Sequence, residues 1–306
     1  MKNAYFESHC EPFEVPHDNP DKRVTLLSHI WLPEGEVKGI FLGIHGGMAH
    51  AGDWVTPALY FKKKGIATFA LDLRWHGTYP QYNQGGKVLF HIQSYDQYVN
   101  DIHHYYLDIQ QRYPNVPIYI LSHSNGSLIA LLYGLGVGRA TAIKGFIVSS
   151  PWIKNKVEVP KIVLKFLGVI AAIAPRLAVK PESLTDKLTH DPEITARHHA
   201  DESIGLRGTK ATVRVGMESQ RAQAWLLEHI HEWARYPIFA VLAGQDYLAD
   251  FRTSEATLRK IPPKLLTLKI YEENYHENFN ELNREEIYEE ILTWVKALDG
   301  RSNLGT

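Results

Sequence analysis

Short apolar runs alternate with longer segments of helical periodicity from residue 24 onward. Runs rich in β-branched and aromatic residues predict strands at 24–32, 39–45, 66–72, 117–122, 144–149, 238–243 and 265–271. Apolar positions at helical spacing predict helices near 54–64, 94–112, 126–134, 254–260 and 284–298. This alternation is typical of a mostly parallel sheet covered by helices, with antiparallel pairing in its first strands. The predicted fold class is therefore α/β.

One interval, residues 151–236, breaks the alternation. It has no convincing strand pattern, only apolar helical stretches separated by Pro175, Pro181 and Pro192. Because it begins just after one buried strand and ends just before the next, we expect it to stand over the strand ends as a helical cap. The predicted organisation is a core domain, residues 1–150 and 237–306, with a cap or lid at 151–236.

Composition and charge narrow the possible partners. The chain has 306 residues, 44% of them hydrophobic and 22% charged, which is ordinary for a globular protein. Its 33 Lys and Arg residues against 34 Asp and Glu leave no net field that would attract nucleic acid. We therefore expect no nucleic-acid partner, and the sequence does not indicate an oligomeric state.

Cysteine usage and the length of apolar runs bear on location. The single cysteine, Cys10, can form no intramolecular disulfide, and residues 1–16 lack the apolar core of a signal peptide. The longest apolar run, residues 162–174, contains Lys165 and is shorter than the roughly 20 residues that span a bilayer. We expect a cytoplasmic protein whose contact with membranes, if it makes any, is peripheral.

A candidate nucleophile follows the predicted strand 117–122. Ser124 lies between that strand and an apolar helical segment, and Gly126 comes two residues later. This arrangement is typical of the nucleophile elbow, in which a tight turn presents a serine hydroxyl at a helix N-terminus. The alternative is a serine that only caps a helix.

Two further residues support the chemical interpretation. Asp246 follows the predicted strand 238–243, and His276 follows the predicted strand 265–271. Ser, Asp and His then occur in the chain order of an α/β-hydrolase triad, at the strand edge where open α/β sheets build their sites. Asp250 is a rival for the role of Asp246, and His276 is one of 16 histidines.

The segment after the predicted strand 39–45 contains Gly46 and Gly47. Small residues here allow a backbone N–H to approach a developing oxyanion, so we assign one donor to Gly47 and the second to Asn125. The alternative is a turn that needs glycine for a positive φ. The histidines show no zinc-type spacing, and the sequence predicts neither a metal nor another cofactor; those considered are His45, His50, His103, His104, His198 and His199.

These motifs resemble the monoglyceride lipase and lysophospholipase group of the α/β-hydrolase superfamily, over roughly residues 24–298. The resemblance is carried by 45–47 with His50, 72–77, the turn at Ser124, 150–151, 188–193, 244–250 and 269–276. It implies an α/β-hydrolase fold with a mostly parallel eight-stranded sheet and an inserted helical cap. It places the triad on Ser124, Asp246 and His276 and the oxyanion donors on Gly47 and Asn125, and it favours Asp246 over Asp250.

The chain departs from the pattern of that group at four positions. Ser122, Ser127 and Trp75 stand where glycine is usual, and Asn125 stands where methionine is common. Serine is small enough for the elbow. The side chain of Asn125 would make the acyl pocket less apolar.

The resemblance implies a serine hydrolase that cleaves carboxylic esters of the acylglycerol or lysophospholipid type through an acyl-enzyme. In the cap, the apolar segment 161–175 is expected to line an acyl channel through Phe166, Leu167 and Ile170, and to touch a membrane surface transiently. A helix buried within the cap is the alternative. A short-chain carboxylesterase, an amide hydrolase, a cofactor-free haloperoxidase and a binding protein without catalysis stay open as other functions.

Overall fold

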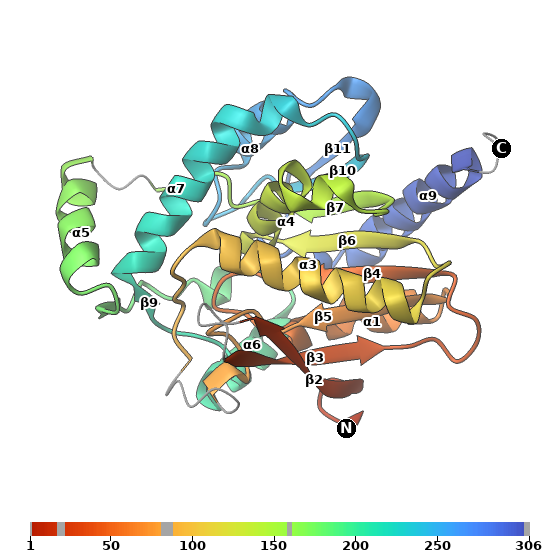
Figure 1. Ribbon diagram of the computed structural model, residues 1–306, viewed down its shortest axis with the longest axis horizontal. Coiled ribbons are helices and arrows are strands. Elements are labelled where there is room, and N and C mark those ends of the chain that lie inside the picture. Colours follow the sequence, from red (N-terminus) through yellow and green to blue (C-terminus); the bar gives the residue numbers. More distant parts are fainter. Residues whose placement is uncertain (1, 17–21, 81–87, 158–160, 303–306) are drawn as a thin grey trace.

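The computed structural model describes residues 2–16, 22–80, 88–157 and 161–302 (Figure 1). Its central feature is a twisted sheet with the strand order β1-β2-β3-β5-β4-β6-β7-β10-β11. The strands are β1 Lys2–Asn3, β2 Ser8–Pro16, β3 Arg23–Trp31, β4 Gly39–Ile44, β5 Ile66–Leu71, β6 Ile118–His123, β7 Gly145–Ser149, β10 Ile238–Ala243 and β11 Leu266–Tyr271. In this order, β2, β3 and β5 pair antiparallel with one another, and the strands from β5 through β4, β6, β7 and β10 to β11 pair parallel. This is the predicted α/β-hydrolase architecture.

Strand β2 was not among the predicted strands. It is a nine-residue strand that pairs along its length with β3, although it contains two prolines and several charges. Proline is tolerated at or near a sheet edge, and only the two-residue β1 lies outside β2. Without β1 the sheet has the predicted eight strands, β2 among them, and β1 adds a ninth.

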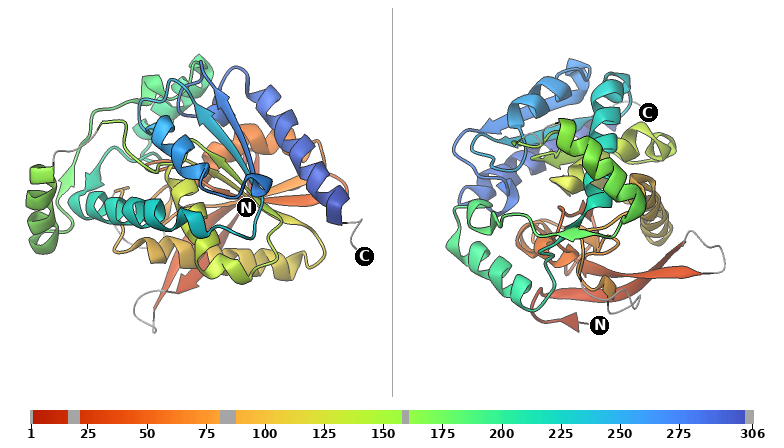
Figure 2. Two further views of the ribbon diagram at one scale, coloured as in Figure 1. Left: turned by 90° about the horizontal axis from the view of Figure 1, so that it is seen from above. Right: turned by 90° about the vertical axis from the view of Figure 1, so that its left-hand side faces the viewer.

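Helices cover both faces of the sheet (Figure 2). The helices α3 and α4 pack on one face, where Tyr105 and Leu128 join the larger apolar core. The helices α1 and α9 pack on the other face, where Phe61 and Ile291 join a second core. Their bounds are α1 Val55–Lys62, α3 Tyr95–Arg112, α4 Asn125–Leu135, α8 Phe251–Leu258 and α9 Arg284–Ser302, which agree with the predicted helices. Short 3₁₀ helices are η1 Ala51–Trp54, η2 Val137–Ala140, η3 Thr185–Lys187, η4 Ile230–Glu232, η5 Pro263–Leu265 and η6 Asn278–Asn280.

Between β7 and β10 the described residues form three α-helices and two very short strands. They are α5 Lys161–Ile173, β8 Ala178–Val179, α6 Pro192–Ser203, β9 Ala211–Thr212 and α7 Val213–His229. The expectation of no strand here was wrong, because β8 and β9 form an antiparallel pair. Two residues are too few to show a strand periodicity in the sequence. Helix α5 lies against α7 and stands apart from the central sheet, at the left of Figure 1 and of the left-hand view in Figure 2.

None of the helices in the described residues is both long enough and apolar enough to cross a membrane.

Trp75 adopts the left-handed backbone conformation, with φ of +66°. That conformation explains why glycine is usual at this position in the group that the sequence resembles, and it costs a tryptophan about 1–3 kcal/mol. The indole ring packs at 4.8 Å from the ring of Tyr79 and 5.5 Å from that of His91. The guanidinium of Arg176 lies 5.3 Å from the indole centroid. These contacts offset the strain and join the segment after α5 to the core domain.

Candidate active site

Ser124 occupies a strained turn between β6 and α4. Its backbone has φ of +54° and ψ of −118°, a conformation that places it between the end of a strand and the first turn of a helix. The turn needs glycine at Gly126, because a Cβ atom there would lie 2.0 Å from the carbonyl oxygen of Ile44. The predicted strand–serine–helix geometry is therefore present, and a serine that only caps the helix does not explain it: its side chain makes no cap hydrogen bond.

The two serines that replace glycines near the turn are accommodated by hydrogen bonds. Ser122 Oγ donates to the carbonyl of Ile147 over 3.0 Å, and Ser127 Oγ donates to the carbonyl of Ser149 over 3.1 Å. Both serines are fully buried. Because each hydroxyl has a backbone acceptor, these substitutions leave no unpaired donor in the core.

Asp246 and His276 meet beyond the ends of β10 and β11. His276 Nδ1 donates to Asp246 Oδ2 over 2.7 Å, and both side chains are buried. The other carboxylate oxygen of Asp246 accepts from the backbone N–H groups of Leu248 and Ala249. Asp250 instead caps α8 by accepting from Arg252 and Thr253 N–H groups. The aspartate that pairs with His276 is thus Asp246 and not Asp250.

Electrostatics reinforce this pair. Burial alone would raise the pKa of the Asp246 carboxyl, but the His276 imidazole and the two backbone donors lower that pKa below its usual value. Burial alone would lower the pKa of His276, but the charge and hydrogen bond of Asp246 outweigh it and raise that pKa. His276 Nε2 is buried and has no hydrogen-bond partner within the described part of the chain. It is the ring atom left to exchange a proton.

The segment after β4 passes beside Ser124. A Cβ atom on Gly46 would lie 3.4 Å from the Cβ of Ser124, and one on Gly47 would lie 2.9 Å from the ring of Phe90. His45 holds this segment in place, because its Nδ1 donates to the carbonyl of Gly46 and its Nε2 accepts from the N–H of Leu73. Both nitrogens are used, and burial lowers the pKa of His45 to about 4, so its ring is neutral.

Asn125 is the first residue of α4, next to Ser124. Its Oδ1 accepts a 2.7 Å hydrogen bond from the hydroxyl of Tyr95, and the side chain is buried. Its Nδ2 has no partner in the described residues. The departure from methionine therefore introduces a fixed amide and an unpaired donor beside the serine.

Comparison with known proteins identifies the family. The chain matches the family model described as serine aminopeptidase, S33 (Hydrolase_4), over residues 35–283. The chain belongs to this family of α/β-hydrolases. It is 25% identical to a monoacylglycerol lipase of Mycolicibacterium smegmatis over 89% of this chain and 93% of that protein. It is 24% identical to a phospholipase of Bacillus subtilis, over 80% and 90% of the two chains.

A solved structure extends the comparison to the fold. A soluble variant of monoglyceride lipase from Saccharomyces cerevisiae, in complex with a substrate analog, superimposes with a TM-score of 0.79 at 19% identity and covers 94% of this chain and 95% of that one. The protein is a serine hydrolase of the lipase and esterase group.

The three residues expected to line an acyl channel are at least partly exposed, whereas Trp152, at the start of the inserted segment, donates its N–H to the Ser124 carbonyl over 3.1 Å. Phe166 is 66% exposed, and Leu167 and Ile170 are partly exposed, all on α5. The outer face of α5 continues with exposed Val169 and Ile173. The role of Phe166, Leu167 and Ile170 in lining an acyl channel thus remains a prediction, and α5 is not the buried helix of the alternative.

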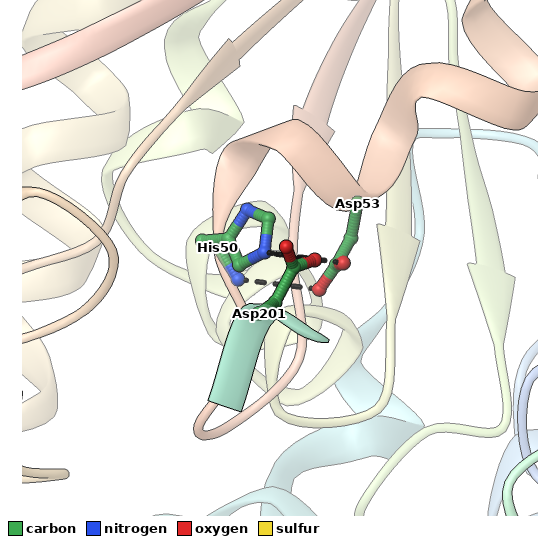
Figure 3. Close-up of side chains that lie close together, drawn as sticks. All are labelled: His50, Asp53 and Asp201. Atoms are coloured by element: carbon green, nitrogen blue, oxygen red, sulfur yellow. Dashed lines mark hydrogen bonds and ion pairs between the residues drawn. The ribbon is translucent and has the colours of Figure 1, made fainter. Parts of the chain in front are cut away.

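One group of three side chains in the described residues has the types and spacing of a metal site. Figure 3 shows His50, Asp53 and Asp201, whose ligand atoms lie within 4.8 Å of one another. His50 Nε2 is 3.1 Å from Asp201 Oδ2 and 3.4 Å from Asp53 Oδ1. Burial alone would lower the pKa of His50, but the carboxylates outweigh it and raise that pKa. A hydrogen bond from His50 Nε2 to Asp201 Oδ2, beside Asp53, accounts for the group without a cation, and the absence of a metal remains a prediction.

Next to this group lies a buried charged cluster that the sequence did not indicate. It consists of Asp53, His198, Arg207 and Glu277, which come from η1, from α6, from the segment before β9 and from the residue after His276. These positions are up to 224 residues apart, from 53 to 277. No local spacing could have shown that they meet, although Glu277 adjoins the predicted base.

Proposed function

We propose that this protein hydrolyses carboxylic esters of the acylglycerol or lysophospholipid type, with Ser124 as nucleophile, His276 as general base and Asp246 as the group that orients the histidine. The observation that carries the proposal is the 2.7 Å bond from His276 Nδ1 to Asp246 Oδ2, which leaves Nε2 free at the edge where Ser124 stands in its strained turn. A buried, paired His and Asp beside such a turn have a clear chemical use.

The reaction follows from these positions. Ser124 Oγ attacks the ester carbonyl carbon while His276 Nε2 takes the hydroxyl proton, and Asp246 stabilises the imidazolium that forms. The N–H groups of Gly47 and Asn125 donate to the oxyanion. His276 then protonates the leaving alcohol. In the second step it takes a proton from water, which attacks the acyl-enzyme carbonyl, and it gives that proton to Ser124 Oγ as the acyl–Oγ bond breaks and the acid leaves. No metal or organic cofactor takes part.

The substrate class rests on the inserted segment and on the relatives. We assign residues 151–236 as a cap on a catalytic domain formed by 1–150 and 237–306. Phe166, Val169 and Ile173 are 60–80% exposed on one face of α5. An exposed apolar helix face of this kind suits transient contact with a lipid surface, from which a single-chain acyl ester would enter. The relatives named monoacylglycerol lipase and phospholipase support the same class. The proposed location is the cytoplasm, peripheral to a membrane.

One observation favours a second candidate, a short-chain carboxylesterase. The Asn125 amide, fixed by Tyr95, has a buried donor without a partner. Such a donor beside the nucleophile disfavours a purely apolar acyl chain and would suit a small or polar one. An amide hydrolase uses the same groups, and the name of the family model points to peptides. The paired His276 and Asp246 disfavour a binding protein without catalysis.

A side-by-side assay tests the proposal. Fatty-acid release is measured from a medium-chain monoacylglycerol, from the matching lysophosphatidylcholine and from a short activated ester, with Ser124→Ala protein as the blank. Faster cleavage of the glyceride assigns a monoglyceride lipase, and faster cleavage of the phospholipid assigns a lysophospholipase. Cleavage of the short ester alone contradicts the lipid assignment and favours the second candidate.

A further inference from the structure

Arg207 lies at the centre of the buried charged cluster, between α6 and β9. Its side chain is 8% exposed, and the side chains of His198 and Glu277 are at most 8% exposed. Nη1 donates to Asp53 Oδ2 over 2.7 Å and to His198 Nδ1 over 3.0 Å. Nη2 lies 3.6 Å from Glu277 Oε1. One guanidinium thus contacts side chains from three separate parts of the chain.

His198 forms a second connection between Arg207 and Glu277. Because its Nδ1 accepts from Arg207, its proton is on Nε2, which donates to Glu277 Oε2 over 2.9 Å. Asn280 Nδ2 donates to the same carboxylate oxygen over 2.7 Å. Glu277 is therefore held by hydrogen bonds from His198 and Asn280 and by an ion pair with Arg207.

Asp53 and Glu277 lie in two segments whose relative position matters to the proposed chemistry. These are the oxyanion segment, which carries Gly47, and the segment that carries His276. Asp53 is three residues past His50, at the end of the segment that carries Gly47. Glu277 directly follows His276. A cavity lined by His45, His123, Asp53 and Glu277 lies between these segments, and beside it the rings of Trp54 and Phe279 pack with centroids 5.9 Å apart. Arg207 adds a charged link between the two segments.

The residue after Arg207 adds a second tie to the oxyanion segment. The N–H of Gly208 donates to the carbonyl of Met48 over 2.8 Å, and Met48 directly follows Gly47. The inserted segment is therefore tied to both sides of the site. The backbone of Gly208 binds Met48, which follows the predicted oxyanion donor, and the side chain of Arg207 contacts Glu277, which follows the predicted base.

Charge makes these contacts sensitive to the loss of Arg207. Burial alone would raise the pKa values of Asp53 and Glu277, but Arg207 and the neighbouring histidines lower both below their usual values. Both carboxylates are therefore ionised, and Arg207 is the group of the cluster with a permanent positive charge. Without it, two buried carboxylates would repel each other or take up protons, and the segments that carry them would shift.

From these contacts we propose that Arg207 is a positioning residue that holds the oxyanion segment and the His276 segment in register. This inference rests on the proposed ester hydrolysis. The positioning role of Arg207 implies that two parts of the inserted segment have different functions. The part from α6 to β9 is anchored to the core domain and supports the catalytic geometry, whereas α5, whose outer face is exposed, lies outside this anchor.

The test compares Arg207→Met and Arg207→Lys with a matched control, Arg221→Met. Arg221 lies in α7, is 70% exposed and pairs only with Glu218 within the described residues. On a short activated ester, which does not need α5, we expect Arg207→Met to lower kcat about 10–100-fold with KM changed less than about threefold. Arg207→Lys should recover part of the loss, and Arg221→Met should behave as wild type.

A second measurement separates positioning from folding. The rate at which a fluorophosphonate probe labels Ser124 should fall by the same factor as kcat, while a thermal melt shows that the variant protein is folded. If Arg207→Met does not fold, Glu277→Gln takes its place. That variant should lower kcat and lower the apparent pKa of His276, because Glu277, together with Asp246, faces His276 with a negative charge, and His123 on the other side is neutral.

Each outcome decides between the two proposals. Wild-type protein that neither cleaves the ester nor reacts with the probe contradicts the proposed function itself. Active wild type with folded Arg207→Met of equal kcat, or with a change confined to KM, overturns the positioning role and leaves the hydrolase function standing.

Discussion

His276 Nδ1 and Asp246 Oδ2 lie 2.7 Å apart and join the two segments that follow β11 and β10. The bond selects the tautomer of the imidazole that has its lone pair on Nε2, the atom without another partner in the described structure. The geometry of this pair underlies the second and third predictions.

Ser124→Ala should abolish ester hydrolysis, with a fall in kcat on the order of 10⁶, because the acyl-enzyme can no longer form. Ser127→Ala is the matched control, since Ser127 is a buried serine three residues away whose hydroxyl donates to the Ser149 carbonyl and lies 3.1 Å from Ser122 Oγ. Hydrolysis of a short activated ester by both variants is the measurement. Residual activity above about 1% of wild type in Ser124→Ala would point to another nucleophile.

The pH profile should reflect the raised pKa of His276. The base must be neutral to take the Ser124 proton, so kcat/KM should fall as pH drops, with a midpoint above the ordinary value of about 6.5. Asp246→Asn removes the charge that raises this pKa. It should move the midpoint to lower pH and lower kcat by about 10⁴. An unchanged midpoint in Asp246→Asn would contradict the assignment of this pair.

The same pair makes stability depend on pH. The Asp246 pKa is lowered on folding, so its contribution is present at neutral pH and is lost as pH falls below about 4, through the folded pKa. The His276 pKa is raised on folding, so its contribution is present below about 6.5 and is lost as pH rises through the folded pKa. Urea melts of wild type and Asp246→Asn should therefore differ less at acid pH than at pH 6. An equal difference at both would contradict the coupling.

Gly47→Ala should lower kcat about 10²–10³-fold, the loss of one oxyanion donor, because its Cβ would collide with the Phe90 ring at 2.9 Å and displace the Gly47 N–H. Gly216→Ala is the control, since a Cβ at Gly216 in α7 meets nothing within 4 Å. Adding Phe90→Ala to Gly47→Ala should restore part of kcat. No rescue would show that crowding at Phe90 is not the cause of the loss.

Replacing Phe166 and Val169 on the exposed face of α5 by serine should reduce hydrolysis of a long-chain ester several-fold and leave a short-chain ester unchanged. Their exposure, 66% and 60%, means that folding does not depend on them. Leu282→Ser is the control, since Leu282 is 68% exposed outside the inserted segment. The assay compares laurate with acetate esters on vesicles, and equal losses for both esters would contradict a role of α5 in lipid recognition.

A chelator should leave hydrolysis and melting temperature unchanged, because the hydrogen bond from His50 Nε2 to Asp201 Oδ2, with Asp53 Oδ1 3.4 Å from the same nitrogen, accounts for the metal-like group. Activity or a melting temperature that falls with chelator and returns with a divalent transition metal would contradict this. If that response then disappeared in Asp201→Asn, it would assign a cation to the group in Figure 3.

The strand–turn–helix around Ser124, the helical periods and the strands of the parallel sheet could be predicted because they depend on residues close in the chain. The turn at Ser124 needs only a strand before it, a helix after it and glycine at position 126, and all of these lie close together in the chain. Ser124, Asp246 and His276 each follow a parallel strand, and they can meet because the carboxyl ends of parallel strands lie at one edge of the sheet. Strand β2 escaped prediction because its prolines and charges disturb the period that marks a strand.

The sequence by itself determined the fold class and the three candidate residues of the triad. Only the tertiary structure decided that Asp246 pairs with His276 while Asp250 caps α8, that α5 turns an apolar face outward, and that Arg207 joins Asp53 to Glu277. The physical reason is the distance along the chain over which each interaction acts. Hydrophobic periodicity and turn chemistry depend on residues that are close in the sequence. The ion pair between Arg207 and Asp53 joins residues 154 positions apart, and it forms only when the folded chain buries both side chains together.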